Sequence, residues 1–120
     1  ILVKSYIQQK YNTKVIGCAT IRNKNKVALS SRNLLLNKNE LFLASQVIKD
    51  LFKFKNKFRK SKNINYLLKI KKFNLQNKYK IKIEYLENRK IKNLKKIDVF
   101  NQSKIFIAYY INQVRLIDNL

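Results

Sequence analysis

The stretch Ile105-Phe-Ile-Ala-Tyr-Tyr-Ile-Asn-Gln-Val-Arg-Leu-Ile117 decides the fold of this chain. Its first seven residues are apolar or aromatic, which favours a buried β-strand over residues 105–111. Asn112-Gln113 then predicts a tight turn, and residues 114–117 are expected to pair back as the second strand of a hairpin. An antiparallel sheet is therefore the centre of the predicted fold.

A second β pattern lies upstream, where tyrosine and isoleucine alternate with lysine and glutamate over residues 79–85. This period of two predicts a half-buried strand whose tyrosines and isoleucines face the helices of the same domain. Alternating aromatic and basic residues are also typical of platforms that bind single-stranded nucleic acids, so that interpretation stays open here.

Two amphipathic helices are predicted between the N-terminal part and the sheet. Asn37 stands three residues before Glu40, which is the spacing of a capping box, and apolar residues then repeat every three or four positions to about Phe58. A second helix is expected over residues 63–72, with Ile64, Leu67 and Leu68 on one face. The predicted fold class is α+β, with these helices packed on a small antiparallel sheet.

The N-terminal part has a different pattern. Residues 1–11 show helical spacing. Residues 13–21 form a short, mostly apolar stretch, which predicts a buried strand with Cys18 as a core residue. A helix followed by a buried strand is the tail of a βαβ unit, and the partners of this strand are expected upstream of Ile1. The chain has no methionine, so we expect that it is not a complete translation product.

The polar loop Ala28-Leu-Ser-Ser-Arg-Asn33 separates these two parts. Two hydroxyls, one guanidinium and one amide in one loop suit a polyphosphate, because arginine stays charged and its planar fork matches phosphate oxygens. A plain polar turn, with Ser30 as a helix cap, is the alternative.

Composition narrows the functional classes. The single cysteine excludes an internal disulfide and fits a reducing, cytoplasmic compartment, and the absence of histidine argues against a metal cluster or a histidine-based catalytic triad. No apolar stretch is long enough for a membrane helix.

The net charge of +22 arises almost entirely from lysine in a chain rich in Asn, Ile, Tyr and Phe. This bias is expected from an AT-rich genome; a selected basic surface is the alternative, and weak polyanion binding is expected from either.

Two groups of residues carry a resemblance to a known family. Cys18-Ala-Thr-Ile-Arg22 followed by Val27-Ala-Leu-Ser-Ser-Arg-Asn33 resembles the nucleotide loop of pantothenate synthetases (pantoate–β-alanine ligases). Val114-Arg-Leu-Ile-Asp-Asn119 resembles their closing strands. The chain departs from the family pattern at Ala19, where proline is usual, at Lys26, where glycine is usual, and at Leu35, where tyrosine is typical.

The resemblance implies an ATP-dependent carbon–nitrogen ligase that joins pantoate and β-alanine through pantoyl adenylate, with Mg²⁺, giving pantothenate, AMP and pyrophosphate. It implies that Ser30 and Ser31 bind the ATP phosphates, that Arg32 pairs with the β- and γ-phosphates, and that the backbone at Ile21 and Leu29 lines the nucleotide site. No catalytic or metal-binding residue is assigned to this chain. A homodimer is also implied, and we expect Arg22 to be a structural ion-pair partner.

The family's His-x-Gly-His and Gly-x-Lys-Asp-x-Gln-Gln segments are absent from this chain. We therefore expect the C-terminal part of the enzyme, inactive alone, with residues 1–29 as a remnant of a Rossmann-like nucleotide-binding domain and residues 30–120 as the C-terminal domain. Two alternatives remain open: a basic RNA-binding or ribosome-associated module, and one half of a split or decaying synthetase.

Overall fold

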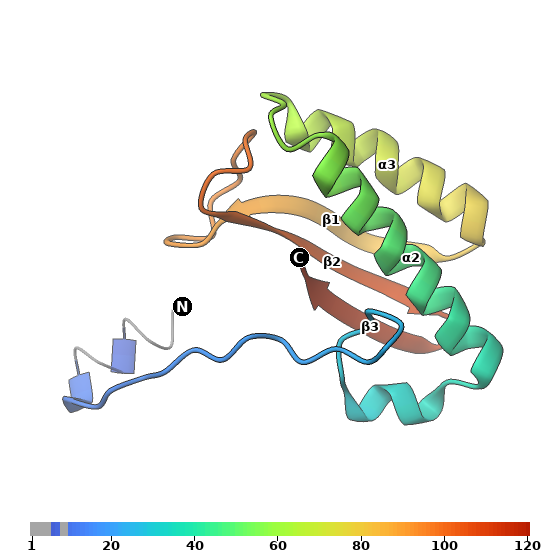
Figure 1. The fold of residues 1–120 in the computed structure, drawn as a ribbon, viewed down its shortest axis with the longest axis horizontal. Coiled ribbons are helices and arrows are strands. Elements are labelled where there is room, and N and C mark those ends of the chain that lie inside the picture. Colours follow the sequence, from blue (N-terminus) through green and yellow to red (C-terminus); the bar gives the residue numbers. More distant parts are fainter. Residues whose placement is uncertain (1–5, 8–9) are drawn as a thin grey trace.

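The structure, a computed structural model, describes residues 6–7 and 10–120 of the chain. Its centre is a three-stranded antiparallel sheet in the order β1-β2-β3. The strands are β1 (Lys82–Lys90), β2 (Ser103–Ile111) and β3 (Val114–Asn119), as Figure 1 shows. The predicted hairpin is confirmed, because Ile111 pairs with Val114 across the two-residue turn, and β3 continues two residues beyond the predicted end.

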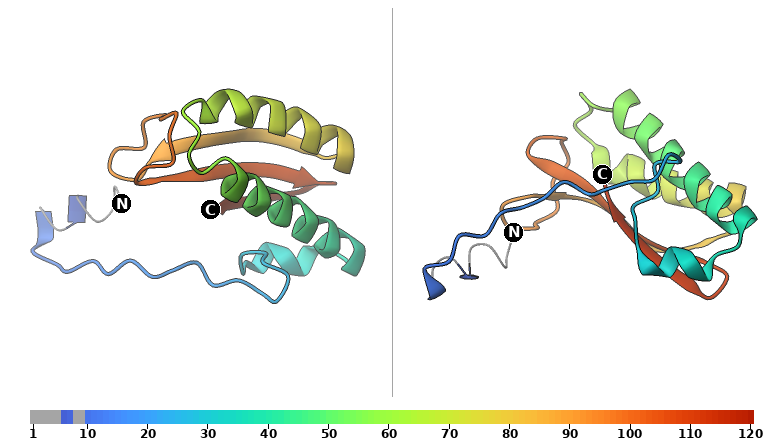
Figure 2. Two further views of the ribbon diagram at one scale, coloured as in Figure 1. Left: turned by 45° about the horizontal axis from the view of Figure 1, so that its top comes forward. Right: turned by 60° about the horizontal axis from the view of Figure 1, so that its bottom comes forward.

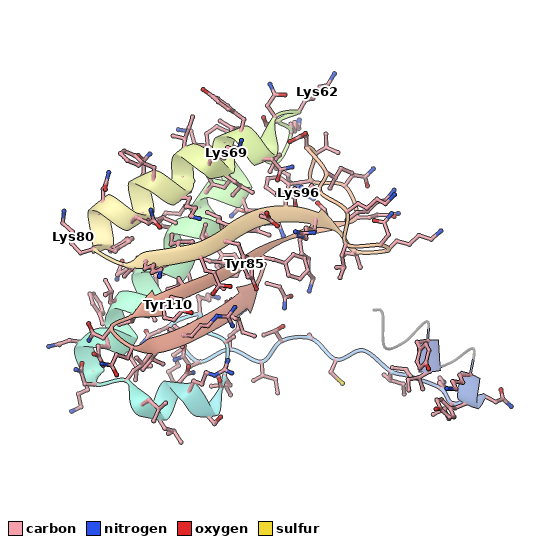
Figure 3. The ribbon with its side chains drawn as sticks, turned by 180° about the vertical axis from the view of Figure 1, so that it is seen from behind. Lys62, Lys69, Lys80, Tyr85, Lys96 and Tyr110 are labelled. Atoms are coloured by element: carbon pink, nitrogen blue, oxygen red, sulfur yellow. The ribbon has the colours of Figure 1, made fainter. Side chains whose placement is uncertain are left out.

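Two helices lie on one side of this sheet, while its other face carries no helix of the described residues (Figures 1 and 3). They are α2 (Lys38–Lys57) and α3 (Ile64–Tyr79), and a short 3-10 helix, η1 (Ser31–Leu35), precedes them. This arrangement confirms the α+β class, with helices packed on a small antiparallel sheet.

Helix α2 begins as predicted. The Asn37 side chain accepts a hydrogen bond from the backbone N–H of Glu40 at 3.0 Å, and the Glu40 carboxylate accepts one from the N–H of Asn37 at 2.8 Å. This capping box satisfies two N–H groups that have no partner inside the helix.

Helix α3 is longer than predicted. The sequence pattern predicts an end near residue 72 and places Tyr79 at the start of the following strand. Instead Leu75, only 1% exposed, continues the buried stripe of Ile64 and Leu68. The Tyr79 hydroxyl donates to Asp50 on α2 at 2.9 Å. Tertiary packing thus extends the helix through asparagines of low helical propensity.

A bulge in β1 changes which side chains face the helices. Ile83 pairs with Tyr109 and Tyr85 pairs with Ala108, so Glu84 is an extra residue on β1. Such a bulge reverses the alternation of faces. The prediction that Tyr85 faces the helices is therefore wrong. Tyr85 lies half-buried near Tyr110 on the sheet face that carries no described helix, here called the open face (Figure 3).

The hydrophobic core lies between the inner face of the sheet and the two helices. Its fully buried side chains come from α2, α3 and β2, and include Val47, Ile48, Leu51, Ile64, Leu68, Leu75, Ile105, Ile107 and Tyr109.

The N-terminal segment differs most from expectation. Residues 6–7 and 10–11 are helical, and the rest of the helix predicted over residues 1–11 lies outside the described residues. Residues 13–21 are not a buried strand: they run away from the sheet (Figures 1 and 2), with Ile16 73% and Ile21 71% exposed. Cys18 is exposed as well. A strand needs a neighbour to satisfy its backbone. Along residues 13–21 the described residues provide a backbone partner only at the end of the segment, where the Ile21 carbonyl accepts a hydrogen bond from the Leu29 N–H.

Among the described residues, left-handed backbone conformations occur at six that are not glycine. Two of them are asparagines, Asn12 and Asn112, and the others are Lys26, Lys80, Leu94 and Gln102. A side chain with a Cβ atom is strained in this region of φ.

In the part of the chain that the structure describes, no helix is long and apolar enough to cross a membrane.

The turn at residues 23–27 yields a stability prediction. Lys26 has φ 70°, and it stands where the family resembled by this sequence has glycine. Lys26→Gly should raise the free energy of unfolding by about 1 kcal/mol, because glycine adopts this φ without strain. Chemical denaturation of the wild type and the variant measures the change.

Lys24→Gly is the matched control, because Lys24 lies in the same turn, is also exposed and does not have positive φ. It removes the same charge but should lower the free energy of unfolding by a few tenths of a kcal/mol or more, through the greater freedom of the unfolded chain. Equal effects of the two variants would contradict the assignment of strain to Lys26.

Candidate functional site

The loop singled out in the sequence begins at a closed turn. Arg22 and Ala28 form an isolated antiparallel bridge, and the Asn23 N–H donates to the Val27 carbonyl at 3.0 Å. The Asn23 side chain accepts hydrogen bonds from the N–H groups of Asn25 and Val27, both at 3.0 Å. The turn is therefore held by its own polar groups.

Arg22 attaches this turn to the last strand. Its guanidinium donates two hydrogen bonds to the Asp118 carboxylate, at 2.6 and 2.9 Å, and one to the Asn119 carbonyl at 3.0 Å. A fourth goes to the Lys26 carbonyl at 2.9 Å. The Asp118 side chain is 4% exposed, so this pair is largely shielded from water. The expectation that Arg22 is a structural ion-pair partner is confirmed.

Helix α2 supports the turn from the other side. The Arg22 guanidinium lies 5.3 Å from the ring centroid of Phe52, within cation–π range. The buried Ser45 hydroxyl donates to the Asn25 carbonyl at 2.9 Å. Contacts from α2 and β3 therefore fix the point at which the loop begins.

The loop itself turns into η1. The Ser30 hydroxyl oxygen accepts a hydrogen bond from the Arg32 N–H at 3.3 Å, which makes Ser30 the cap of this short helix. The Asn33 amide donates to the Ala28 carbonyl at 3.0 Å and closes the loop. Ser30, Ser31 and Arg32 remain exposed, so their polar groups are accessible to a ligand.

A cavity of about 210 Å³ lies beside this loop. Leu29, Ser30 and Arg32, three of the residues predicted to bind ATP, line it, whereas Ile21 and Ser31 do not. The Ile21 carbonyl nevertheless accepts a hydrogen bond from the Leu29 N–H at 3.0 Å, which places it next to the loop.

The remaining walls come from distant parts of the chain and could not be identified from motifs. They are contributed by α2, β2 and β3, through Ile48, Tyr109, Leu116, Ile117 and Asp118. The alternation of inward-facing residues in the hairpin was the available signal for Tyr109 and Leu116. Their contact with the loop is a consequence of tertiary packing.

The ionisable side chains that line the cavity are Arg32, Tyr109 and Asp118. Burial raises the pKa of the Tyr109 hydroxyl, and the nearby Asp118 carboxylate adds to this shift, so Tyr109 is neutral near pH 7. Asp118 is the one acidic residue among the described residues that line the cavity, and Arg22 pairs with it. Within the described residues no ion pair involves Arg32, whose charge is thus available to an anion.

Comparison with known proteins identifies relatives of this chain. The family model described as pantoate-beta-alanine ligase matches residues 1–120. The pantothenate synthetase of Ruthia magnifica is 39% identical over 101 residues, which cover 83% of this chain and 36% of that protein. The enzyme of Flavobacterium psychrophilum is 30% identical over 123 residues, covering 99% of this chain and 43% of that protein. The chain thus spans less than half the length of these curated relatives.

Solved structures agree with this result. The crystal structure of pantothenate synthetase from Thermus thermophilus superposes with a TM-score of 0.80 at 22% identity, over 98% of this chain and 44% of that one. The pantoate-beta-alanine ligase from Francisella tularensis, solved in complex with beta-gamma ATP and beta-alanine, gives a TM-score of 0.67 at 28% identity and covers 99% of this chain and 38% of that one.

The superposition on the Thermus thermophilus structure shows the fold. The family model extends over the whole sequence of this chain, including the loop and the closing strand that line the cavity. The chain belongs to the pantoate-beta-alanine ligase family.

Proposed function

We propose that this chain supplies the ATP phosphate loop and the C-terminal domain of a pantothenate synthetase. The complete enzyme would activate pantoate with ATP to pantoyl adenylate and pyrophosphate. β-Alanine would then displace AMP to form the amide bond of pantothenate. The observation that carries the proposal is a cavity lined by Leu29, Ser30, Arg32 and Asn33. All 120 residues of the chain around this cavity match the family model.

The chemistry of the loop supports this assignment. Adenylate formation expels pyrophosphate, so negative charge grows on the β-phosphate as the bond to the α-phosphate breaks. Arg32 has no carboxylate partner among the described residues, and the Ser30 hydroxyl retains its hydrogen for donation to a phosphate oxygen. Donors and charges fixed in place before the reaction stabilise such a transition state more than water does.

The related enzyme from Francisella tularensis was solved in complex with beta-gamma ATP and beta-alanine, which supports ATP and β-alanine as ligands of the complete enzyme. The resemblance also implies Mg²⁺. The cavity offers this ion no free carboxylate among its described residues, because Asp118 accepts hydrogen bonds from Arg22 and from the Asn119 N–H. Mg²⁺ would need ligands outside these residues, such as phosphate oxygens and water.

The division of the chain forms part of the proposal. Residues 1–29 would belong to a Rossmann-like nucleotide-binding domain, and residues 30–120 would form the C-terminal domain. The exposed apolar side chains of residues 13–21 support this division, since such side chains normally lie against other protein. The resemblance further implies a homodimer, and the single cysteine fits a reducing, cytoplasmic compartment.

The chain alone is not expected to make pantothenate. The family's histidine signature and pantoate-binding segment are absent from the 120 residues, and a phosphate loop by itself cannot align two reactants. Pantothenate synthesis by the isolated chain would contradict this part of the proposal.

Arg32→Ala in the complete enzyme should lower the rate of adenylate formation by about 100-fold or more, because it removes one preorganised charge from the transition state. Pyrophosphate release with ATP and pantoate, measured without β-alanine, isolates this half-reaction. Arg59→Ala is the matched control: it removes the same charge from an exposed arginine that does not line the cavity, and its rate should be unchanged. Pyrophosphate release at the wild-type rate from Arg32→Ala would overturn the assigned role.

A polyanion-binding function is the second candidate, and the net charge of +22 is the observation that favours it. The open face of the sheet does not strengthen it. Tyr85 and Tyr110 lie there (Figure 3). However, Glu84 accepts hydrogen bonds from Tyr110 and Arg115, and Glu87 lines the same surface hollow as Tyr85. These carboxylates would face the backbone phosphates of a bound nucleic acid.

RNA binding by the chain should therefore be weak and lost near physiological salt, as expected from charge alone. Titration of a labelled single-stranded RNA at increasing salt measures this. Tight binding that persists above about 0.15 M salt and distinguishes sequences would favour the RNA-binding function instead.

A further inference from the structure

An acidic side chain stands in the wall of the proposed phosphate site. Asp118 lines the same cavity as Ser30 and Arg32. A free carboxylate there would repel a triphosphate and would cancel part of the attraction from Arg32. The site can therefore bind a polyanion well only if the charge of Asp118 is neutralised.

The contacts of Asp118 provide this neutralisation. Both carboxylate oxygens accept from Arg22, at 2.6 and 2.9 Å, and one of them also accepts from the Asn119 N–H at 2.7 Å. Exposure of the two side chains is low, 4% for Asp118 and 17% for Arg22. A two-point pair of this kind fixes orientation as well as charge.

Arg22 is not itself available to a phosphate. Four of its hydrogen bonds go to Asp118, to the Asn119 carbonyl and to the Lys26 carbonyl, and its guanidinium lies over Phe52. A guanidinium has five N–H donors in all, so at most one remains. Arg22 must then affect phosphate binding through the residues that it contacts, chiefly Asp118.

We propose that Arg22 is a positioning residue that neutralises Asp118, so that the cavity presents the charge of Arg32 to a triphosphate without an opposing carboxylate. This inference rests on the proposed function, because it takes the loop at residues 28–33 to be a phosphate loop. It adds a role for Arg22 and Asp118, two residues separated by 96 positions in the chain.

Titration of the full chain with inorganic tripolyphosphate at about 0.15 M salt tests the proposal, with circular dichroism to verify that each variant is folded. Arg22→Ala should weaken binding by about tenfold or more, because it leaves an unpaired carboxylate in the cavity wall. Asp118→Asn should bind within about twofold of wild type or more tightly, because it removes the repelling charge.

The double variant Arg22→Ala with Asp118→Asn separates charge from structure. It should regain most of the affinity lost in Arg22→Ala, although it lacks the ion pair, since the carboxylate is gone. A merely structural role predicts the reverse, that the double variant binds as weakly as Arg22→Ala. The comparison remains valid if Arg22→Ala does not fold, because the double variant can be judged against wild type and Asp118→Asn.

The pair Arg115–Glu84 is the matched control. Arg115 on β3 holds the Glu84 carboxylate with two hydrogen bonds, at 2.7 and 3.0 Å, on the open face of the sheet and away from the loop. Arg115→Ala should change tripolyphosphate binding by less than about twofold, as expected for an exposed pair. A loss as large as that of Arg22→Ala would show that total charge, not the position of the charge, is responsible, and would overturn the proposal.

Arg32→Ala distinguishes this inference from the proposed function. If wild-type binding does not depend on Arg32, the phosphate-loop assignment fails and the role of Arg22 fails with it. If binding depends on Arg32 while Arg22→Ala binds like wild type, or the double variant shows no recovery, only the role of Arg22 is overturned.

Discussion

Burial of the inner face of β2 is the interaction on which the rest of this structure depends. Ile105, Ile107 and Tyr109 are at most 1% exposed, and β2 pairs with both other strands. Full burial of side chains of this size stabilises a fold by about 1.5–3 kcal/mol each. The strand therefore sets the register of β1 and β3 and the surface on which α2 and α3 pack. Tyr109 also forms part of the cavity wall, so the same packing shapes the site.

The candidate site is assembled from parts of the chain that are distant in sequence. The loop at residues 28–33 supplies hydroxyls, an amide and a guanidinium that has no ion-pair partner among the described residues, whereas β3 supplies part of the remaining wall. Arg22 connects them through Asp118 and Asn119. Ser45 and Phe52 of α2 hold the turn in place. The loop, which the sequence makes polar and short of glycine, thus owes its placement to contacts with rigid elements on both sides.

Acidic residues have structural roles in this strongly basic chain. All six carboxylates lie in the described part, and four form ion pairs: Asp50, Glu84, Glu87 and Asp118. Glu40 belongs to the capping box of α2, and Asp98 accepts a hydrogen bond from the Asn65 N–H in the first turn of α3. Burial alone would raise the pKa of the Asp50 carboxyl group, but hydrogen bonds from Lys78 and Tyr79 and the charge of Lys71 outweigh this and hold the pKa below its ordinary value. The few acids therefore join elements to one another, while the many lysines lie largely at the surface.

Local patterns in the sequence determined the hairpin at residues 105–117, the capping box at Asn37 and the character of the loop at residues 28–33, because turns, caps and alternation depend on neighbouring residues. Tertiary structure alone decided the continuation of α3 to Tyr79, the bulge that turns Tyr85 outward, and the exposure of residues 13–21. Each of these depends on which distant surface is available for burial. The site divides in the same way: the motif identified Ser30 and Arg32, but only folding brings Asp118 to the cavity wall and Arg22 against it, since that contact spans 96 positions.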